Sequence, residues 1–287
     1  MLKEFVQPNA KINIGLNVIG RLPTGYHQLD MVMAPIGIQD KLEINISDKS
    51  GTLKINTNKD DIPTDHRNIL YKVYESFYTE SGLERRETAV FLEKIIPHEA
   101  GLGGGSADGA FFLKVLNKYH NDHFSPDELA AIGLKTGADI PFFLLNKTAR
   151  VGGIGEVLTP VVNRLRRKIL IVKPPFGVST SEAYRLSGTL KEKKAADIPA
   201  ILRGLAENRP DLVDGAVQNQ LEQGLLTTNE KLAAFKRELE KTETYRFFMS
   251  GSGSAYYAFV PEDTTEGKIA ELKYKLINCE VFLCNFL

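Results

Sequence analysis

A run of glycines directly before a segment of helical character is the pattern in this chain best suited to binding phosphate. The run is PHEAGLGGGSADGA, from Pro97 to Ala110. Glycine allows the backbone to approach an anion closely and to adopt positive φ, and the first N–H groups of the following helix point at the ligand along the helix dipole. A plain flexible loop is the alternative interpretation of such a run.

Two polar residues follow the glycines. Ser106 and Asp108 supply a hydroxyl and a carboxylate at the mouth of the expected helix, and the hydroxyl could ligate a metal ion. The run is not a Walker A loop, because no Gly-Lys-Ser/Thr closes it. A lysine that neutralises phosphate must therefore come from elsewhere in the chain or be absent. The glycine spacing also differs from the dinucleotide-binding fingerprint.

Two further segments contain charged side chains that could belong to a functional site. Residues 5–18 alternate in polarity like one strand, which predicts Lys11 and Asn13 side by side on one face. Asp139 lies in GADIPFF, where Gly, Ala, Ile and Pro leave a carboxylate poorly hydrated and in need of a partner. The plainer alternatives are a solvated strand lysine and an aspartate that only caps a helix or turn.

Helix and strand patterns alternate along the chain, with glycine turns between them. Helices are expected near residues 68–82, 127–137, 178–187, 198–226, 229–241 and 263–277, besides the one after the glycine run. Gly82 is the expected stop of the first, and Ser125-Pro126 with Glu128 is the expected capping box before the second. Strands are expected near 31–38, 41–47, 52–56, 88–97, 168–175 and 280–286, and on both sides of a glycine turn within 246–260. This order favours an α+β fold over a doubly wound parallel sheet. A second unit is expected after Leu158, giving domains 1–158 and 159–287.

The composition narrows the class of partner. The chain has 287 residues, with 36 Lys and Arg against 36 Asp and Glu, so net charge indicates neither nucleic acid nor a membrane surface as a partner. No apolar run reaches the ~20 residues of a membrane span. Cys279 and Cys284 show no metal-ligand pattern, and two thiols fit a reducing compartment. We expect a cytoplasmic protein with a small-molecule substrate.

Three segments, in this order, resemble the GHMP kinase superfamily: PNAKINIGLNV at residues 8–18, the glycine run, and MSGSGSAYYAFV at 249–260. The resemblance is closest to one branch of that superfamily, because AKIN is followed by GYHQLD. GADIPFFL, GGIGEVL and PPFGVSTSEAY also occur at that branch's places. The similarity covers nearly the whole length.

The resemblance implies a two-domain α+β fold. Its N-terminal, ATP-binding domain is like the second domain of ribosomal protein S5, its C-terminal domain is ferredoxin-like, and the substrates bind in the cleft between them. The implied reaction uses ATP and Mg²⁺ to phosphorylate the 2-hydroxyl of 4-diphosphocytidyl-2-C-methyl-D-erythritol, in the non-mevalonate route to isoprenoids. A monomer or weak homodimer is expected. The alternatives are the same chemistry on a homoserine-like or mevalonate-like alcohol, and a non-catalytic paralogue that binds nucleotide.

The resemblance also assigns residues. Asp139 would be the catalytic base and Lys11 would lie beside it, while Ser106 would reach Mg²⁺. Tyr26 and His27 resemble the pair that holds cytosine, with Tyr184 stacking on the other face. The implied ATP and phosphate contacts are Pro97, Gly101, Leu102, Gly103, Gly104, Gly105, Ser106 and Ala107. The implied substrate contacts are Asn13, Tyr26, His27, Lys147, Thr180, Tyr184, Gly251, Ser252 and Gly253.

The chain departs from the family pattern at several positions. The usual GGGSSDAA is here GGGSADGA, and glycine at position 109 costs the helix roughly 1 kcal/mol. Glu99 places a carboxylate near the expected triphosphate, which is unfavourable unless the side chain points away. Gln220 follows Asn219 where the family often has aspartate, so a charge is missing near the expected site.

Overall fold

The computed structural model describes residues 1–287, which form two compact units that interleave along the sequence. Unit 1 comprises residues 1–10, 38–96 and 103–146, and unit 2 comprises residues 11–37, 97–102 and 147–287. The domain boundary predicted after Leu158 is a division along the sequence, and it stays a prediction.

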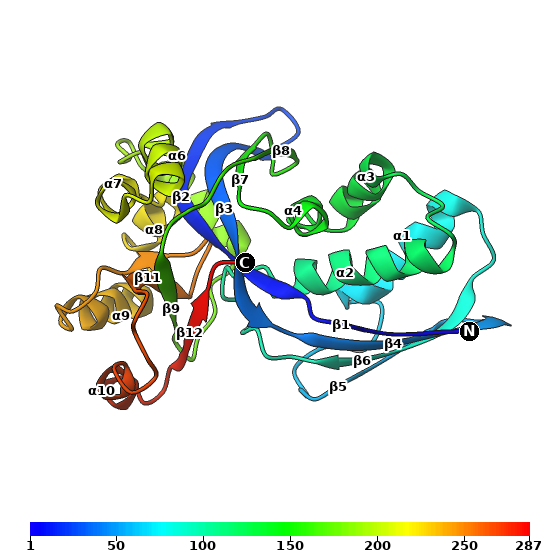
Figure 1. The fold of residues 1–287 in the computed structure, drawn as a ribbon. Helices are drawn as coiled ribbons and strands as arrows, with labels where there is room; N and C mark the ends of the chain where they lie inside the picture. The colour runs from blue at the N-terminus through cyan, green and yellow to red at the C-terminus, as the bar shows by residue number, and fades with distance from the viewer. The chain divides into compact units, whose positions relative to one another are not determined.

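Unit 1 is a four-stranded sheet with helices on one face (Figure 1). The strand order is β1-β4-β6-β5, formed by β1 (Leu2–Val6), β4 (Lys41–Ser50), β5 (Leu53–Thr57) and β6 (Arg86–Glu93). β5 and β6 are parallel, and the other two pairs are antiparallel. The helices are α1 (Ile69–Ser81), α2 (Gly104–Tyr119), α3 (Pro126–Thr136) and α4 (Ile140–Leu145). Alternate residues of the central strands are buried, as a sheet covered on one face requires.

Local signals fix the ends of the unit 1 helices. Ser125 and Glu128 form the capping box that the sequence predicts at the start of α3. Gly82 ends α1 in the left-handed conformation with φ 66°, which confirms the predicted stop. Asn68 accepts the Leu70 N–H and caps the start of the same helix.

Unit 2 contains two further sheets (Figure 1). One has the order β10-β11-β9-β12, formed by β9 (Arg167–Lys173), β10 (Phe248–Met249), β11 (Tyr256–Pro261) and β12 (Glu280–Asn285). Its paired strands are all antiparallel. The other has the order β2-β3-β7-β8, formed by β2 (Asn9–Arg21), β3 (His27–Gln39), β7 (Ala149–Gly152) and β8 (Val157–Pro160). The helices are α5 (Thr180–Thr189), α6 (Ile198–Glu207), α7 (Pro210–Ala216), α8 (Gln220–Leu225), α9 (Glu230–Glu240) and α10 (Ala270–Lys275).

Several predicted elements differ from the structure. The single strand expected over residues 5–18 is wrong, because β1 ends at Val6 and β2 begins after Pro8, which has no N–H to donate. The helical stretch expected over 198–226 is three helices, interrupted at Asn208 with φ 54° and again before Asn219. The final helix is limited to residues 270–275. Strands β7 and β8 were not predicted. The helices are all too short or too polar to cross a membrane.

Candidate active site

Lys11 and Asn13 lie on the same face of β2, as the alternation predicts. The Lys11 ammonium donates to the Asn13 side-chain oxygen at 2.6 Å and to the Gly101 carbonyl at 2.7 Å. Both side chains are buried, each residue being 4% exposed, so Lys11 is not the solvated strand lysine of the alternative interpretation. The Lys11 backbone N–H also donates to the Leu102 carbonyl at 3.0 Å, which fixes β2 to the start of the glycine loop.

The glycine loop adopts the backbone conformation that its composition predicts. Gly101 and Gly103 have φ of 71° and 74°, in the left-handed region that glycine tolerates. A Cβ on Gly101 would lie 2.0 Å from the Ser250 carbonyl oxygen, so only glycine allows this approach. Gly103 is the N-cap of α2 and offers no side-chain capping bond, so no cap occupies the first N–H groups of the helix. That end of α2 is suited to bind an anion.

The carboxylate of Glu99 lies against Gly177. A Cβ on Gly177 would come within 2.1 Å of Glu99 Oε2. The Glu99 backbone has φ 48°, and its carbonyl accepts the Ser254 N–H at 3.2 Å. The side chain is therefore directed to the segment after β9, which accounts for how this position accommodates a carboxylate.

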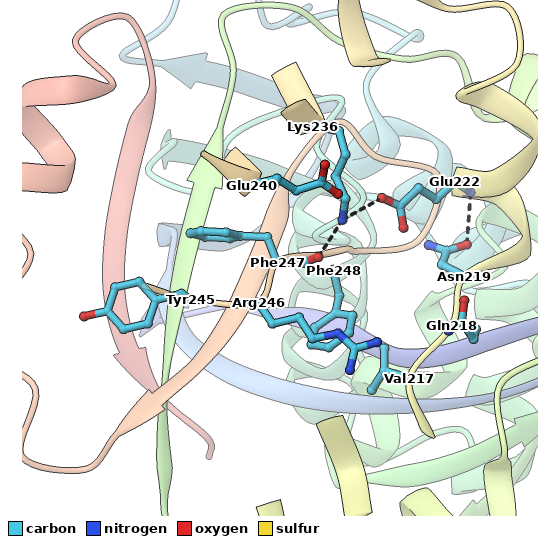
Figure 2. Close-up of a pocket in the computed structure, with 10 residues that line it drawn as sticks. All are labelled: Val217, Gln218, Asn219, Glu222, Lys236, Glu240, Tyr245, Arg246, Phe247 and Phe248. Atoms are coloured by element: carbon cyan, nitrogen blue, oxygen red, sulfur yellow. Dashed lines mark hydrogen bonds and ion pairs between the residues drawn. The ribbon is translucent and has the colours of Figure 1, made fainter. Parts of the chain in front are cut away.

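The third glycine segment, residues 250–254, is fixed by two polar side chains. The Ser250 hydroxyl donates to the Gly101 carbonyl at 2.9 Å and accepts the Asn13 N–H at 3.3 Å. The Asn219 amide donates to the carbonyls of Met249 at 2.9 Å and Gly251 at 2.8 Å. Its oxygen caps α8 by accepting the Leu221 and Glu222 N–H groups. Figure 2 shows Asn219 beside Glu222 in the lining of a pocket of about 360 Å³.

Sequence reasoning did not assign these supporting roles. Ser250 stood inside the quoted segment without a function, and Asn219 was noted only as part of a family element. An asparagine two residues before a helical apolar residue is a capping signal that could have identified Asn219. Gln220 is buried, and its side-chain oxygen accepts the Val18 N–H at 2.8 Å. The uncharged amide at this position therefore forms a hydrogen bond that holds β2 in place.

Two of the residues predicted to bind the cytosine ring, His27 and Tyr184, are stacked on each other. The rings of His27 and Tyr184 have centroids 4.8 Å apart and planes inclined by 19°. Burial lowers the pKa of His27, and the charges of Arg21 and Lys193 lower it further, which favours the neutral imidazole. Tyr26 is 61% exposed at the preceding position. Lys147 is also exposed, just after α4.

Thr180 and Ser252 are also brought together. Their hydroxyls lie 3.0 Å apart, which places the start of α5 beside the third glycine segment. Gly251 and Gly253 have φ of 53° and 80° in that segment, as expected of a glycine turn. A Cβ on Gly251 would lie 3.2 Å from the Lys11 ammonium and 3.0 Å from the Asn13 side-chain oxygen. Asn13 and Gly251, two of the predicted substrate residues, therefore lie next to Lys11.

Asp139 and Ser106 belong to unit 1. Asp139 occupies the N-cap position of α4, yet its side chain makes no capping hydrogen bond, so capping does not explain the carboxylate. Ser106 lies in the first turn of α2, and its hydroxyl would be 3.4 Å from a Cβ on Gly137, two residues before Asp139. Lys11 belongs to the other unit, so its predicted proximity to Asp139 stays a prediction.

Asp108 is placed differently from the expectation. It was expected at the mouth of α2, but its carboxylate is buried in the second turn and lies 2.9 Å from the Lys94 ammonium. Lys94, which was not singled out from the sequence, also pairs with the buried carboxylate of Asp40. The reason is that the side chain of the fifth residue of the helix points into unit 1 toward Lys94, which follows β6, and is not exposed at the helix N-terminus.

Matches to two family models define the class of protein. The family model described as GHMP kinases N terminal domain matches residues 68–147, and the one described as GHMP kinases C terminal matches residues 193–277. These matches confirm the predicted GHMP kinase fold. A solved homoserine kinase from Cytophaga hutchinsonii has the same fold, with a TM-score of 0.76, 17% identity and coverage of 99% of this chain and 95% of that one.

Proteins with higher sequence identity to this chain are named for one enzyme activity. A 4-diphosphocytidyl-2-C-methyl-D-erythritol kinase of Fusobacterium nucleatum is 44% identical over 98% of this chain and 97% of its own. One from Carboxydothermus hydrogenoformans is 38% identical over 93% of this chain and 91% of its own. A crystal structure of a 4-(cytidine 5'-diphospho)-2C-methyl-D-erythritol kinase aligns with a TM-score of 0.78 and 27% identity, over 98% of this chain and 99% of that one. This chain belongs to the family of 4-diphosphocytidyl-2-C-methyl-D-erythritol kinases.

Proposed function

We propose that this protein transfers the γ-phosphate of ATP to the 2-hydroxyl of 4-diphosphocytidyl-2-C-methyl-D-erythritol. The observation that carries the proposal is a single atom, the Gly101 carbonyl oxygen. It accepts hydrogen bonds from the Lys11 ammonium at 2.7 Å and from the Ser250 hydroxyl at 2.9 Å. Residues of all three segments that resemble this family therefore meet at one point of unit 2. Phosphoryl transfer depends on such positioning more than on covalent chemistry from the protein.

The catalytic roles follow from the residue types. Asp139 is the base that accepts the proton of the substrate hydroxyl, because this role requires a carboxylate and the resemblance to the family assigns it to this position. Lys11 supplies a buried ammonium held in one orientation by Asn13 and Gly101, suited to stabilise charge as it spreads over the transferring phosphoryl group. The uncapped N-terminus of α2, with Gly103 to Ser106, binds the phosphates through backbone N–H groups.

A magnesium ion fits the donor set. Unit 1 offers the Ser106 hydroxyl at the phosphate end of α2, and the chain has no group of three His, Cys, Asp or Glu side chains arranged to hold a metal. Mg²⁺ commonly takes one or two protein oxygens and completes its shell with substrate phosphates and water. When bound with ATP it would neutralise phosphate charge, while Ser106 holds it from the protein side.

The proposal for the acceptor substrate rests on the aromatic pair of His27 and Tyr184. His27 and Tyr184 present a planar, stacked surface, and a neutral imidazole can both donate and accept hydrogen bonds at the edge of a cytosine ring. Tyr26, Lys147, Thr180, Ser252 and the neighbouring glycines Gly251 and Gly253 complete the proposed substrate contacts. The two family models fall on either side of Leu158, which supports the proposed division into domains 1–158 and 159–287.

A coupled ADP-release assay tests the proposal. The purified protein with MgATP is offered the cytidyl substrate, homoserine, mevalonate and galactose in parallel. Turnover with the cytidyl substrate alone is the expected result. Turnover only with another alcohol would keep the kinase and reject the acceptor. No turnover with any of them, while ADP still binds, would move the chain to the nucleotide-binding paralogues.

A further inference from the structure

Lys173, the last residue of β9, is a buried lysine that none of the roles above involves. It is 6% exposed. Its ammonium donates to two backbone carbonyls, those of Pro174 at 2.7 Å and Phe176 at 3.0 Å. Burial lowers the pKa of Lys173, and the carboxylates of Glu280 and Glu99 offset only part of this effect. Because a buried ammonium is costly, we expect this position to need the hydrogen bonds that a lysine donates.

The segment that follows β9 cannot supply these hydrogen bonds from its own backbone. Pro174 and Pro175 come directly after Lys173, and proline has no backbone N–H. In an ordinary turn, backbone N–H groups close the chain by donating to carbonyls two to four residues away. An ammonium carries three N–H donors, and that of Lys173 donates to the carbonyls on both sides of Pro175. The conformation of the loop 174–179 therefore depends on this side chain.

The Phe176 carbonyl is shared by two donors from different parts of unit 2. It accepts the Lys173 ammonium at 3.0 Å and the Ser254 hydroxyl. The Ser254 backbone N–H in turn donates to the Glu99 carbonyl at 3.2 Å. The Glu99 carboxylate lies against Gly177, the next residue of the loop. The loop is thus joined both to the third glycine segment and to the residues that precede the glycine loop.

The same loop leads into α5, which carries two of the proposed substrate contacts. Thr180 is the first residue of α5, and its hydroxyl lies 3.0 Å from that of Ser252. Tyr184, one turn further, stacks on His27. Ser179 is the N-cap of α5 but makes no side-chain capping hydrogen bond. The position of this helix end therefore depends on the loop before it and not on a local cap.

We propose that Lys173 is a positioning residue for the cytidyl substrate. Its ammonium supplies the donors that the prolines lack and holds the loop 174–179 on the third glycine segment through the Phe176 carbonyl. The loop in turn sets the positions of Thr180 and Tyr184. The inference rests on the proposed function, because it requires that the cytidyl substrate binds at these two residues.

The test is steady-state kinetics of Lys173→Met with each substrate varied in turn. Methionine keeps most of the length of the side chain and removes every donor. KM for the cytidyl substrate should rise about tenfold, the effect of losing one or two hydrogen bonds that orient its site. KM for ATP should change less than about twofold, because Lys11 and Ser250 hold the Gly101 carbonyl independently of Lys173. The value of kcat should also change little, because the loop lies at the proposed cytosine contacts and not at the transferred phosphoryl group.

Lys168→Met is the matched control. Lys168 belongs to the same strand, and its ammonium also donates to a backbone carbonyl, that of Thr264 at 2.6 Å. The control therefore removes the same kind of hydrogen bond at the other end of β9. Both KM values of Lys168→Met should equal those of the wild type, whatever the change in its free energy of unfolding. A change in KM for the cytidyl substrate is thus a readout that loss of stability alone does not produce.

A second variant, Ser254→Ala, tests the inference in case Lys173→Met does not fold. It removes the other donor to the Phe176 carbonyl and leaves Lys173 in place. KM for the cytidyl substrate should rise again, with KM for ATP unchanged.

Three results would overturn the inference and leave Lys173 a structural residue. They are an unchanged KM for the cytidyl substrate in folded Lys173→Met, equal rises in both KM values, and wild-type KM values in folded Ser254→Ala. Failure of the wild type to turn over the cytidyl substrate would instead reject the proposed function.

Discussion

Gly101 and Ser250 approach each other so closely that a single added carbon at Gly101 would lie 2.0 Å from the Ser250 carbonyl oxygen. The two residues are far apart in the sequence, yet the Ser250 hydroxyl also donates to the Gly101 carbonyl at 2.9 Å. The glycine loop and the third glycine segment are thus in backbone contact. This contact, and not flexibility, is the reason for glycine at position 101.

Replacing Gly101 with alanine should therefore destabilise the protein strongly. The new Cβ meets a backbone atom that no rotamer change can move, and φ of 71° adds the left-handed cost of about 1–2 kcal/mol. Overpacking adds about 1–3 kcal/mol, so the free energy of unfolding in urea should fall by about 2–5 kcal/mol. Gly82→Ala is the control, with φ 66° and nothing within 4 Å of the new carbon. Equal losses in the two variants would show that the close approach is unimportant.

Lys11→Met should remove the buried ammonium that joins β2 to the glycine loop. The Asn13 oxygen loses this donor and the Gly101 carbonyl keeps Ser250, so stability should fall by about 1–3 kcal/mol. Because the same charge is proposed to stabilise the transferring phosphoryl group, kcat should fall at least about 100-fold. Lys54→Met, on the exposed face of β5, is the control in both measurements. A variant with normal kcat and lowered stability would make Lys11 a structural residue only.

The features predicted from sequence are those with a local signal. Alternation predicted Lys11 next to Asn13, the glycine run predicted the start of α2, and a capping box predicted the start of α3. These follow from residue spacing within one element, which backbone geometry fixes directly.

What sequence reasoning missed depends on tertiary contacts. Lys94 and Asp40 are 54 positions apart, and nothing near either residue in the sequence indicates the other. The sequence correctly places Asp108 near the start of α2, but it does not show which face of the helix the residue occupies. Its carboxylate was therefore expected at the mouth of the helix, whereas it is buried against Lys94. β7 and β8 are four residues each, too short for periodicity to distinguish them from loop.

Asp139→Asn should lower kcat by about 10²–10⁴-fold, the usual contribution of a positioned general base. KM for both substrates should change little, because the amide keeps the shape and the wild-type side chain makes no capping bond to α4 that the substitution would break. Steady-state kinetics with each substrate varied in turn would separate the two constants. Asp60→Asn, an exposed aspartate of the same unit, should behave as wild type. A near-normal kcat for Asp139→Asn would remove Asp139 from the mechanism.

The stacked pair of His27 and Tyr184 can be observed directly, because the chain contains no tryptophan. Tyr184→Trp would place the only indole of the protein on the His27 ring, at the position where the centroids are 4.8 Å apart. A protonated imidazole in contact with an indole quenches its emission, so the fluorescence reports the charge of His27. Cytidine diphosphate should change this emission on binding, since a base that binds this pair must rearrange or cover it.

The pH dependence of that emission has a definite sign. Burial and the charges of Arg21 and Lys193 lower the pKa of His27, so the folded state binds this proton less readily than the unfolded state. Quenching should therefore develop only below about pH 6.5, the ordinary value for histidine, and protonating His27 should destabilise the fold as pH falls through that range. Unfolding separates the indole from the His27 ring, so the ordinary histidine value of about 6.5 is the reference, and Tyr184→Trp combined with His27→Asn should show no such transition. A midpoint in the folded protein at or above about pH 6.5 would contradict the stacked, partly buried placement of His27, and with it the proposed site for the cytosine ring.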